Sequence, residues 1–245
     1  MRIIDAHVHL GDQPHKAYTV DTLQGDLREA GASGAVVFAF PEDMYRIVDS
    51  PESRTAANDH VLQAARRDPD LYPFYFVWND YLLPDTFDEF VGIKWHRHAD
   101  EPRYDYDAPG CHAILERIRA RKMPVTLEEE FDETIRFIER NPGLPVIIPH
   151  CGGLNGGTDR MSVFFDTPDV YFDTAVAPLD ALQWIVKNVP AERIIFGSDV
   201  SATSMPFFNF PVVELAKVRQ LGLGDREMAL ILAGNIDRLV AGVGR

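Results

Sequence analysis

The sequence has little cysteine, and the little it has forms no known motif. The two cysteines, Cys111 and Cys151, lie far apart and fit neither a CxxC pair nor zinc-ribbon spacing. A zinc ribbon and a CxxC redox site are therefore excluded. We expect both residues to be reduced thiols.

Basic residues are also scarce compared with acidic ones. The chain has 24 Lys and Arg against 38 Asp and Glu, a formal net charge of −14 at pH 7. Such a balance repels phosphate backbones and anionic lipid surfaces. We therefore expect a small-molecule substrate, with neither nucleic acid nor a membrane as partner. The oligomeric state, including a homo-oligomer, stays open.

Two further features are absent. No apolar run approaches the ~20 residues needed to span a bilayer, and the N-terminus starts with a strand pattern instead of a basic and apolar signal sequence. We therefore expect a cytoplasmic protein. Neither GxGxxG nor GxxxxGK[ST] occurs, which disfavours a nucleotide-binding, doubly wound sheet.

What the sequence does contain is a regular alternation of strand-like and helix-like segments. Apolar, β-branched runs are followed by longer amphipathic segments, several of which end at Gly or Pro. This is typical of βα units around a parallel sheet. The eight predicted strands cover residues 2–9, 34–40, 71–78, 90–96, 123–128, 144–150, 170–174 and 193–199.

Eight βα units within 245 residues predict a single (β/α)₈ barrel domain, 1–245, because such barrels commonly occupy ~200 to 250 residues. The last segments, 210–222 and 225–242, predict two closing helices, so that an extra C-terminal helix completes the barrel. The doubly wound sheet is the alternative.

In such a barrel, functional residues gather at the carboxyl ends of the strands, where the βα loops build the active site. Polar side chains stand at these positions in five of the predicted strands. They are His7, His9, Lys94, His96, Glu128, His150 and Asp199.

His7 and His9 are separated by one residue, so their imidazoles lie on the same face of the first strand. They could chelate a divalent metal or be two polar side chains on an exposed edge. A buried central strand favours metal ligation, because neutral imidazoles suit zinc.

Each other candidate has an alternative structural role. Lys94 and His96 share a face of their strand and point inward, unless they are exposed at a loop entrance. Glu128 ends a strand, and it either serves the site or begins a helix with the acids that follow. His150 precedes two glycines that permit a close approach, or else it is a core histidine. Asp199 would be costly to bury unpaired, so it either meets a metal or caps a helix.

Three motifs together resemble a known family. They are the HxH of IIDAHVHLGD, the histidine of PHCGG and the aspartate of IIFGSD, joined by GIKWH and by the closing ILAGNIDRLV. In this order the chain resembles the amidohydrolase superfamily, in particular the amidohydrolase-2 branch that includes metal-dependent hydrolases and aminocarboxymuconate-semialdehyde decarboxylase.

The resemblance implies a barrel with one divalent metal, usually zinc, held by His7, His9, Asp199 and a residue of the fifth strand. That branch normally has a histidine in the fifth strand, whereas this chain has PVTLE and therefore Glu128. A carboxylate can also bind zinc. The substitution leaves three outcomes open: a different ligation of zinc, a harder ion such as manganese, or no metal.

The resemblance further implies a hydrolase acting on a small carboxylate-bearing ester, lactone or amide through metal-activated water. Asp199 would accept the proton of the water, and His150 would stabilise the developing charge or act as a second acid–base group. Lys94 and His96 would bind an anionic substrate. Two alternatives remain: a decarboxylase using the same site, and a catalytically inactive ligand-binding barrel.

Overall fold

The structure is a computed structural model that describes residues 1–13, 16–39, 51–97, 103–201 and 208–244. In these residues, a strand lies within each of the eight predicted runs. The strands are β1 (Ile4–His9), β4 (Gly34–Phe38), β5 (Leu71–Val77), β6 (Gly92–His96), β7 (Val125–Glu128), β8 (Val146–Ile148), β9 (Val170–Asp173) and β10 (Ile194–Ile195).

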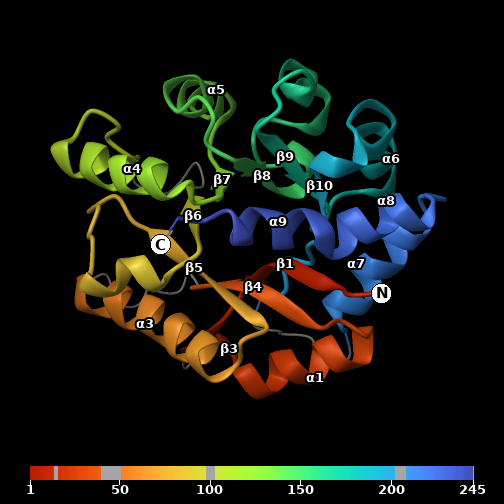
Figure 1. The fold of residues 1–245 in the computed structure, drawn as a ribbon, viewed down its shortest axis with the longest axis horizontal. Helices are drawn as coiled ribbons and strands as arrows, with labels where there is room; N and C mark the ends of the chain where they lie inside the picture. The colour runs from red at the N-terminus through yellow and green to blue at the C-terminus, as the bar shows by residue number, and fades with distance from the viewer. Residues whose placement is uncertain (14–15, 40–50, 98–102, 202–207, 245) are drawn as a thin grey trace.

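Helices surround these strands on the outside, except for the last helix, which lies across one end of the barrel (Figure 1). They are α1 (Val20–Ala30), α3 (Pro51–Arg67), α4 (Pro109–Arg121), α5 (Phe131–Arg140), α6 (Leu179–Asn188), α7 (Phe210–Arg219), α8 (Asp225–Ala229) and α9 (Asn235–Ala241). A small antiparallel hairpin of β2 (Gly11–Gln13) and β3 (Lys16–Tyr18) follows β1, and the sequence pattern did not predict it.

The sheet closes on itself. Its strands pair in parallel in the order β1-β4-β5-β6-β7-β8-β9-β10. The backbone amide of Ala6 in β1 donates to the carbonyl of Phe196 at 2.9 Å, and that of Asp199 donates to the carbonyl of His7 at 2.8 Å. Because these bonds join the first strand to the segment after β10, the predicted (β/α)₈ barrel is confirmed.

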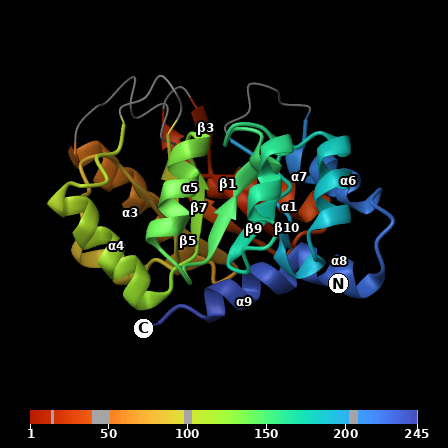
Figure 2. The same ribbon diagram turned by 90° about the horizontal axis from the view of Figure 1, so that it is seen from above.

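The C-terminal helix closes one end of the barrel. Figure 2 shows α9 lying along that end, and its Ile236 and Leu239 belong to the same buried cluster as Ile4 and Phe74 of the strands. A single π turn, Leu230–Gly234, separates α8 from α9, so the predicted closing helix is interrupted. The opposite end, where the strands finish, is therefore the one available for a site.

Helix α1 illustrates how local chemistry sets the elements. Thr19 caps it by accepting from the amide of Thr22, and Gly31 ends it in the left-handed conformation at φ 71°. Its apolar face, which includes Leu23 and Leu27, is buried against the barrel. Among the described helices, none has both the length and the apolar character needed to cross a bilayer.

Strand β1 contains a β-bulge. Asp5 pairs with Ala35 and Val8 pairs with Val37, so β1 has one residue more than β4 over the same stretch. A carboxylate oxygen of Asp5 accepts the amide of Ser198 at 2.9 Å, which ties the bulge to the segment after β10. Bulges redirect side chains and are common next to active sites.

The bulge changes which residues of β1 face the interior. Ile4 and Ala6 pack in the interior cluster above α9, whereas Val8 packs outside, in the cluster that contains residues of α1. His7 and His9 therefore take the inward positions at the carboxyl end of the strand. Their predicted convergence is confirmed, although it depends on the bulge as well as on simple alternation.

Candidate metal centre

The polar residues predicted at the strand ends meet in one buried network. Neighbouring members approach within 3.5 Å of one another through nitrogen and oxygen atoms. The network lies at the carboxyl end of the barrel, opposite α9. Its members are His7, His9, Lys94, His96, Glu128, His150 and Asp199.

Three of these residues, His7, His9 and Asp199, form what we call the His–His–Asp cluster. The Nε2 atoms of His7 and His9 lie 3.4 and 3.3 Å from the same carboxylate oxygen of Asp199. Both imidazoles are buried, while the side chain of Asp199 is 29% exposed and can therefore meet a substrate. Asp199 adopts the left-handed conformation, φ 59°, which aims its carboxylate at the two rings.

The outer nitrogens of both imidazoles are occupied. Nδ1 of His7 lies 2.7 Å from a carboxylate oxygen of Asp173, and Nδ1 of His9 lies 3.1 Å from the carbonyl oxygen of Ala39. Each Nδ1 must donate its proton to these oxygens, so each Nε2 carries a lone pair. Burial, and then the charge of Lys94, lowers the pKa of His7 well below its usual value, and burial lowers that of His9.

Two imidazole lone pairs and a carboxylate oxygen thus face one another without a proton between them. Burial alone would raise the pKa of Asp199, but the positive charge around it, which includes that of His150, outweighs burial and holds that pKa below its usual value, so the carboxylate is ionised. Converging acceptors repel unless a cation lies among them. The ligand atoms of the cluster lie within 4.8 Å of one another, so these residues fit a divalent metal.

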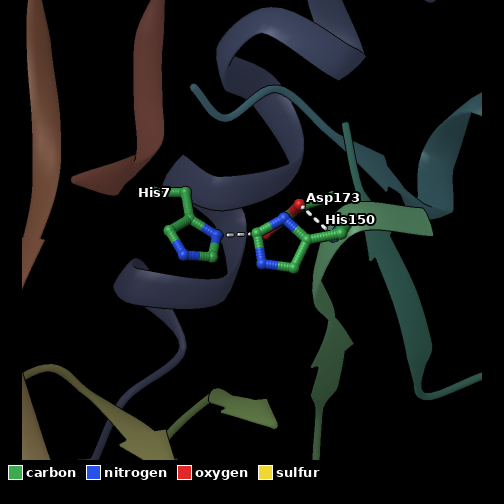
Figure 3. Close-up of side chains that lie close together, drawn as sticks. All are labelled: His7, His150 and Asp173. Carbon is green, nitrogen blue, oxygen red and sulfur yellow. Dashed lines mark hydrogen bonds and ion pairs between the residues drawn. The ribbon is translucent and has the colours of Figure 1, made fainter. Parts of the chain in front are cut away.

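A second group in the described residues also satisfies this distance. It consists of His7, His150 and Asp173, shown in Figure 3. Here, however, Asp173 already accepts from His7 and from the backbone amide of His150, at 2.7 and 2.8 Å. Carboxylates that accept from a ligating histidine commonly orient it for a metal on its other nitrogen. The geometry therefore assigns Asp173 to support of the His–His–Asp cluster.

Lys94 and Glu128 form a buried ion pair beside this cluster. The Lys94 ammonium lies 3.1 Å from a Glu128 carboxylate oxygen and 3.2 Å from Nε2 of His7. His96 and His150 approach the same carboxylate at 3.4 and 3.5 Å. Burial would raise the pKa of Glu128, but His96 and Lys94 hold it well below its usual value. As predicted, Lys94 and His96 share the inward face of β6.

His150 is held in an unusual backbone conformation after β8. Its φ is 56°. Gly152, two residues later, is also left-handed at φ 82°, and a Cβ at that position would come within 2.2 Å of Met161. Burial lowers the pKa of His150, but the hydrogen bond that its ring donates to the Glu128 carboxylate outweighs burial, and the pKa rises to about 9. His150 is therefore cationic at neutral pH. The thiol of Cys151 donates to the carbonyl of Asp173, so it forms no dyad with His150.

A comparison with protein families now identifies the chain's relatives. The model of the amidohydrolase family (Amidohydro_2, described as Amidohydrolase) matches residues 4–241. The chain belongs to this family. The resemblance seen in the sequence motifs is thereby confirmed over nearly the whole chain. No curated protein matches the chain.

Several solved structures share the fold of this amidohydrolase. A protein from Acinetobacter baumannii, named a probable 2-pyrone-4,6-dicarboxylic acid hydrolase, is 16% identical, with 98% of this chain and 100% of that chain covered and a TM-score of 0.73. The 2,6-dihydroxybenzoate decarboxylase from Rhizobium is 14% identical, with 98% and 99% covered and a TM-score of 0.73. At this identity the likeness concerns the fold, and enzymes of both kinds share it.

Asp173 is the residue of this amidohydrolase site that sequence reasoning missed. It is fully buried at the end of β9 and accepts three hydrogen bonds, from the His7 ring and from the backbone amides of His150 and Ala175. An acid after an apolar strand was the signal that singled out Asp199, and VYFDT carries the same signal.

Proposed function

We propose that this amidohydrolase is a metal-dependent hydrolase of a small carboxylate-bearing ester, lactone or amide. The observation that carries the proposal is the His–His–Asp cluster, in which three unprotonated ligand atoms converge at the mouth of the barrel. Two imidazoles and one carboxylate, with a further position left for water or substrate, are typical of catalytic zinc sites.

Zinc is the first choice of metal, and manganese is the alternative. When bound, such an ion lowers the pKa of water and polarises a carbonyl oxygen. Glu128 as a fourth ligand stays a prediction. Its carboxylate is engaged by Lys94 and lies outside the two ligand groups found in the described residues.

The chain's own residues would supply the proton transfers and the substrate contacts. Asp199 is ionised and partly exposed, so it can take a proton from water and deliver it to the leaving group. His150 is cationic and can donate a hydrogen bond to the oxygen that gains negative charge. Lys94 and His96 add positive potential inside the site, which offsets the chain's net negative charge toward a carboxylate substrate.

A decarboxylase is the second candidate, and the protonated state of His150 favours it. A cationic imidazole is an acid that can protonate the carbon from which CO₂ departs. The products separate the two candidates. Hydrolysis incorporates one ¹⁸O from labelled water into the product, whereas decarboxylation releases CO₂.

The hydrolase proposal is tested by metal removal and by Asp199→Asn, assayed on a panel of small lactones, esters and amides that carry a carboxylate. We expect chelation to abolish turnover and zinc or manganese to restore it. Asp199→Asn should lower kcat by about 10²–10⁴-fold, the usual contribution of a general base. Turnover that survives both treatments would exclude this mechanism.

The same proposal includes a small-molecule substrate, no nucleic-acid partner and a cytoplasmic location. The small-molecule substrate and the exclusion of nucleic acid rest on the acidic composition of the chain and on the buried position of the site within the barrel.

A further inference from the structure

Lys94 occupies an unusual place for a cation. Its side chain is completely buried in the barrel interior, with the ammonium 4.9 Å from the ring centre of Phe38. It has two partners with hydrogen-bonding lone pairs, Nε2 of His7 at 3.2 Å and the Glu128 carboxylate at 3.1 Å. An ammonium has three protons and no acceptor, so it must be the donor in both contacts.

The first of these contacts uses an atom that a metal would also need. Because Nδ1 of His7 donates to Asp173, Nε2 holds the only lone pair of this ring that lies in its plane. The same Nε2 belongs to the His–His–Asp cluster. One lone pair can serve either the ammonium or a metal ion, but not both at once.

Glu128 offers the ammonium an acceptor that does not depend on His7. Its carboxylate lies within 3.5 Å of Lys94, His96 and His150, so it is already a shared acceptor at the base of the site. If the contact with His7 is given up, Lys94 keeps a charge-assisted hydrogen bond to Glu128 and is not left unpaired in the interior.

We infer that the Lys94 ammonium and a divalent metal compete for Nε2 of His7, and that Glu128 holds the ammonium when the metal is bound. The inference rests on the proposed metal site and adds a metal-free arrangement, in which Lys94 provides the positive charge that the cluster needs. It also gives Glu128 a role, because a carboxylate retains the ammonium more firmly than a neutral imidazole would.

The test measures metal affinity in metal-stripped protein, by titration with Co²⁺ followed by absorbance and with Zn²⁺ in competition. Lys94→Met removes the rival cation and should tighten metal binding by about ten-fold or more, the scale of other changes around metal ligands. Glu128→Gln removes the carboxylate that would hold the ammonium away from His7, and it should therefore weaken metal binding. Lys187→Met, which removes an exposed lysine of α6, is the matched control and should leave the affinity unchanged.

The double variant Lys94→Met/Glu128→Gln separates this inference from a simpler explanation. In Lys94→Met alone, the released Glu128 carboxylate could ligate the metal and tighten binding for that reason. The double variant has no such carboxylate. It removes both members of the Lys94–Glu128 ion pair together, so we expect it to fold even where a single variant does not. Competition predicts that it binds metal more tightly than the wild type.

Equal or weaker binding by the double variant, in protein whose circular dichroism matches the wild type, would overturn the inference. Binding of metal by neither the wild type nor the double variant would overturn it as well, because removal of the competitor should expose the site. The readout is binding alone. A wild type that binds metal but hydrolyses nothing would contradict the proposed function and leave this inference standing.

Discussion

The single carboxylate of Asp173 connects His7 of the His–His–Asp cluster with the backbone around His150. One of its oxygens accepts from the ring of His7, and the other accepts from the backbone amides of His150 and Ala175. It therefore fixes the tautomer of one metal-ligand candidate and the strained backbone of the proposed acid. Burial raises the pKa of Asp173, although the charge of His150 and the hydrogen bonds from the backbone amides of His150 and Ala175 oppose this rise.

We predict that Asp173→Asn weakens metal binding while the fold is kept. An amide of the same shape has one acceptor oxygen in place of two, so it cannot accept from His7 and from both backbone amides. Zinc affinity should fall by about 10–100-fold, as is usual when the partner of a ligating histidine is lost. Metal titration monitored alongside circular dichroism measures this effect.

His150→Gln serves as the control for that experiment. If the metal lies in the His–His–Asp cluster, the loss of the His150 ring should change zinc affinity by less than about three-fold, well under the loss expected for Asp173→Asn. A large loss in His150→Gln would instead locate the metal in the group of His7, His150 and Asp173.

The two thiols provide a prediction from their pKa values. Burial raises the pKa of Cys111 to about 12 and that of Cys151 well above its usual value. At pH 8 the thiolate of Cys111 is then on the order of one part in ten thousand, and only the thiolate reacts readily. Ellman's reagent should therefore label neither cysteine in native protein and both after denaturation. A rapid reaction of one thiol in the folded protein would contradict this.

At the level of elements, hydrophobic periodicity predicts the barrel well, because buried parallel strands are apolar runs and each is followed by an amphipathic helix. It also places the polar candidates at strand ends. The bulge in β1 is not predictable in this way, since it depends on hydrogen bonds between Asp5 and a segment nearly two hundred residues away. The same limit applies to the pairing of Lys94 with Glu128, which depends on the register of β6 and β7.

Gly197, which follows β10, sets how closely that segment approaches β1. A Cβ at this position would lie 2.8 Å from Cβ of His7, so Gly197→Ala should force the two strands apart. Overpacking of this kind costs about 1–3 kcal/mol of the free energy of unfolding. Metal affinity should fall with it, because His7 and Asp199 lie on the two sides of the contact.

Gly25→Ala is the matched control for Gly197→Ala. Gly25 lies inside α1, and the nearest atom to an added Cβ is the guanidinium of Arg28 at 4.0 Å. Alanine in a helix interior is favoured over glycine, so this variant should be more stable by about 0.5–1 kcal/mol. Urea denaturation measures the free energy of unfolding of both variants. Equal changes in this free energy would show that Gly197 does not approach His7 closely.

At the scale of the whole molecule, the candidate metal ligands lie where the barrel closes. His7 and His9 belong to the first strand, and Asp199 follows the last strand, so an ion bound by all three would cross-link the two ends of the sheet. Zinc at about 100 times its dissociation constant should stabilise the folded state by about 2.7 kcal/mol. For a chain of this size, that corresponds to a rise in Tm of about 5–10 °C.

Differential scanning calorimetry with and without zinc measures this rise, which Asp199→Asn should largely remove. His112→Ala, which removes an exposed histidine of α4, should keep it. A rise of equal size in Asp199→Asn would mean that zinc stabilises the protein from a site other than the seam of the barrel.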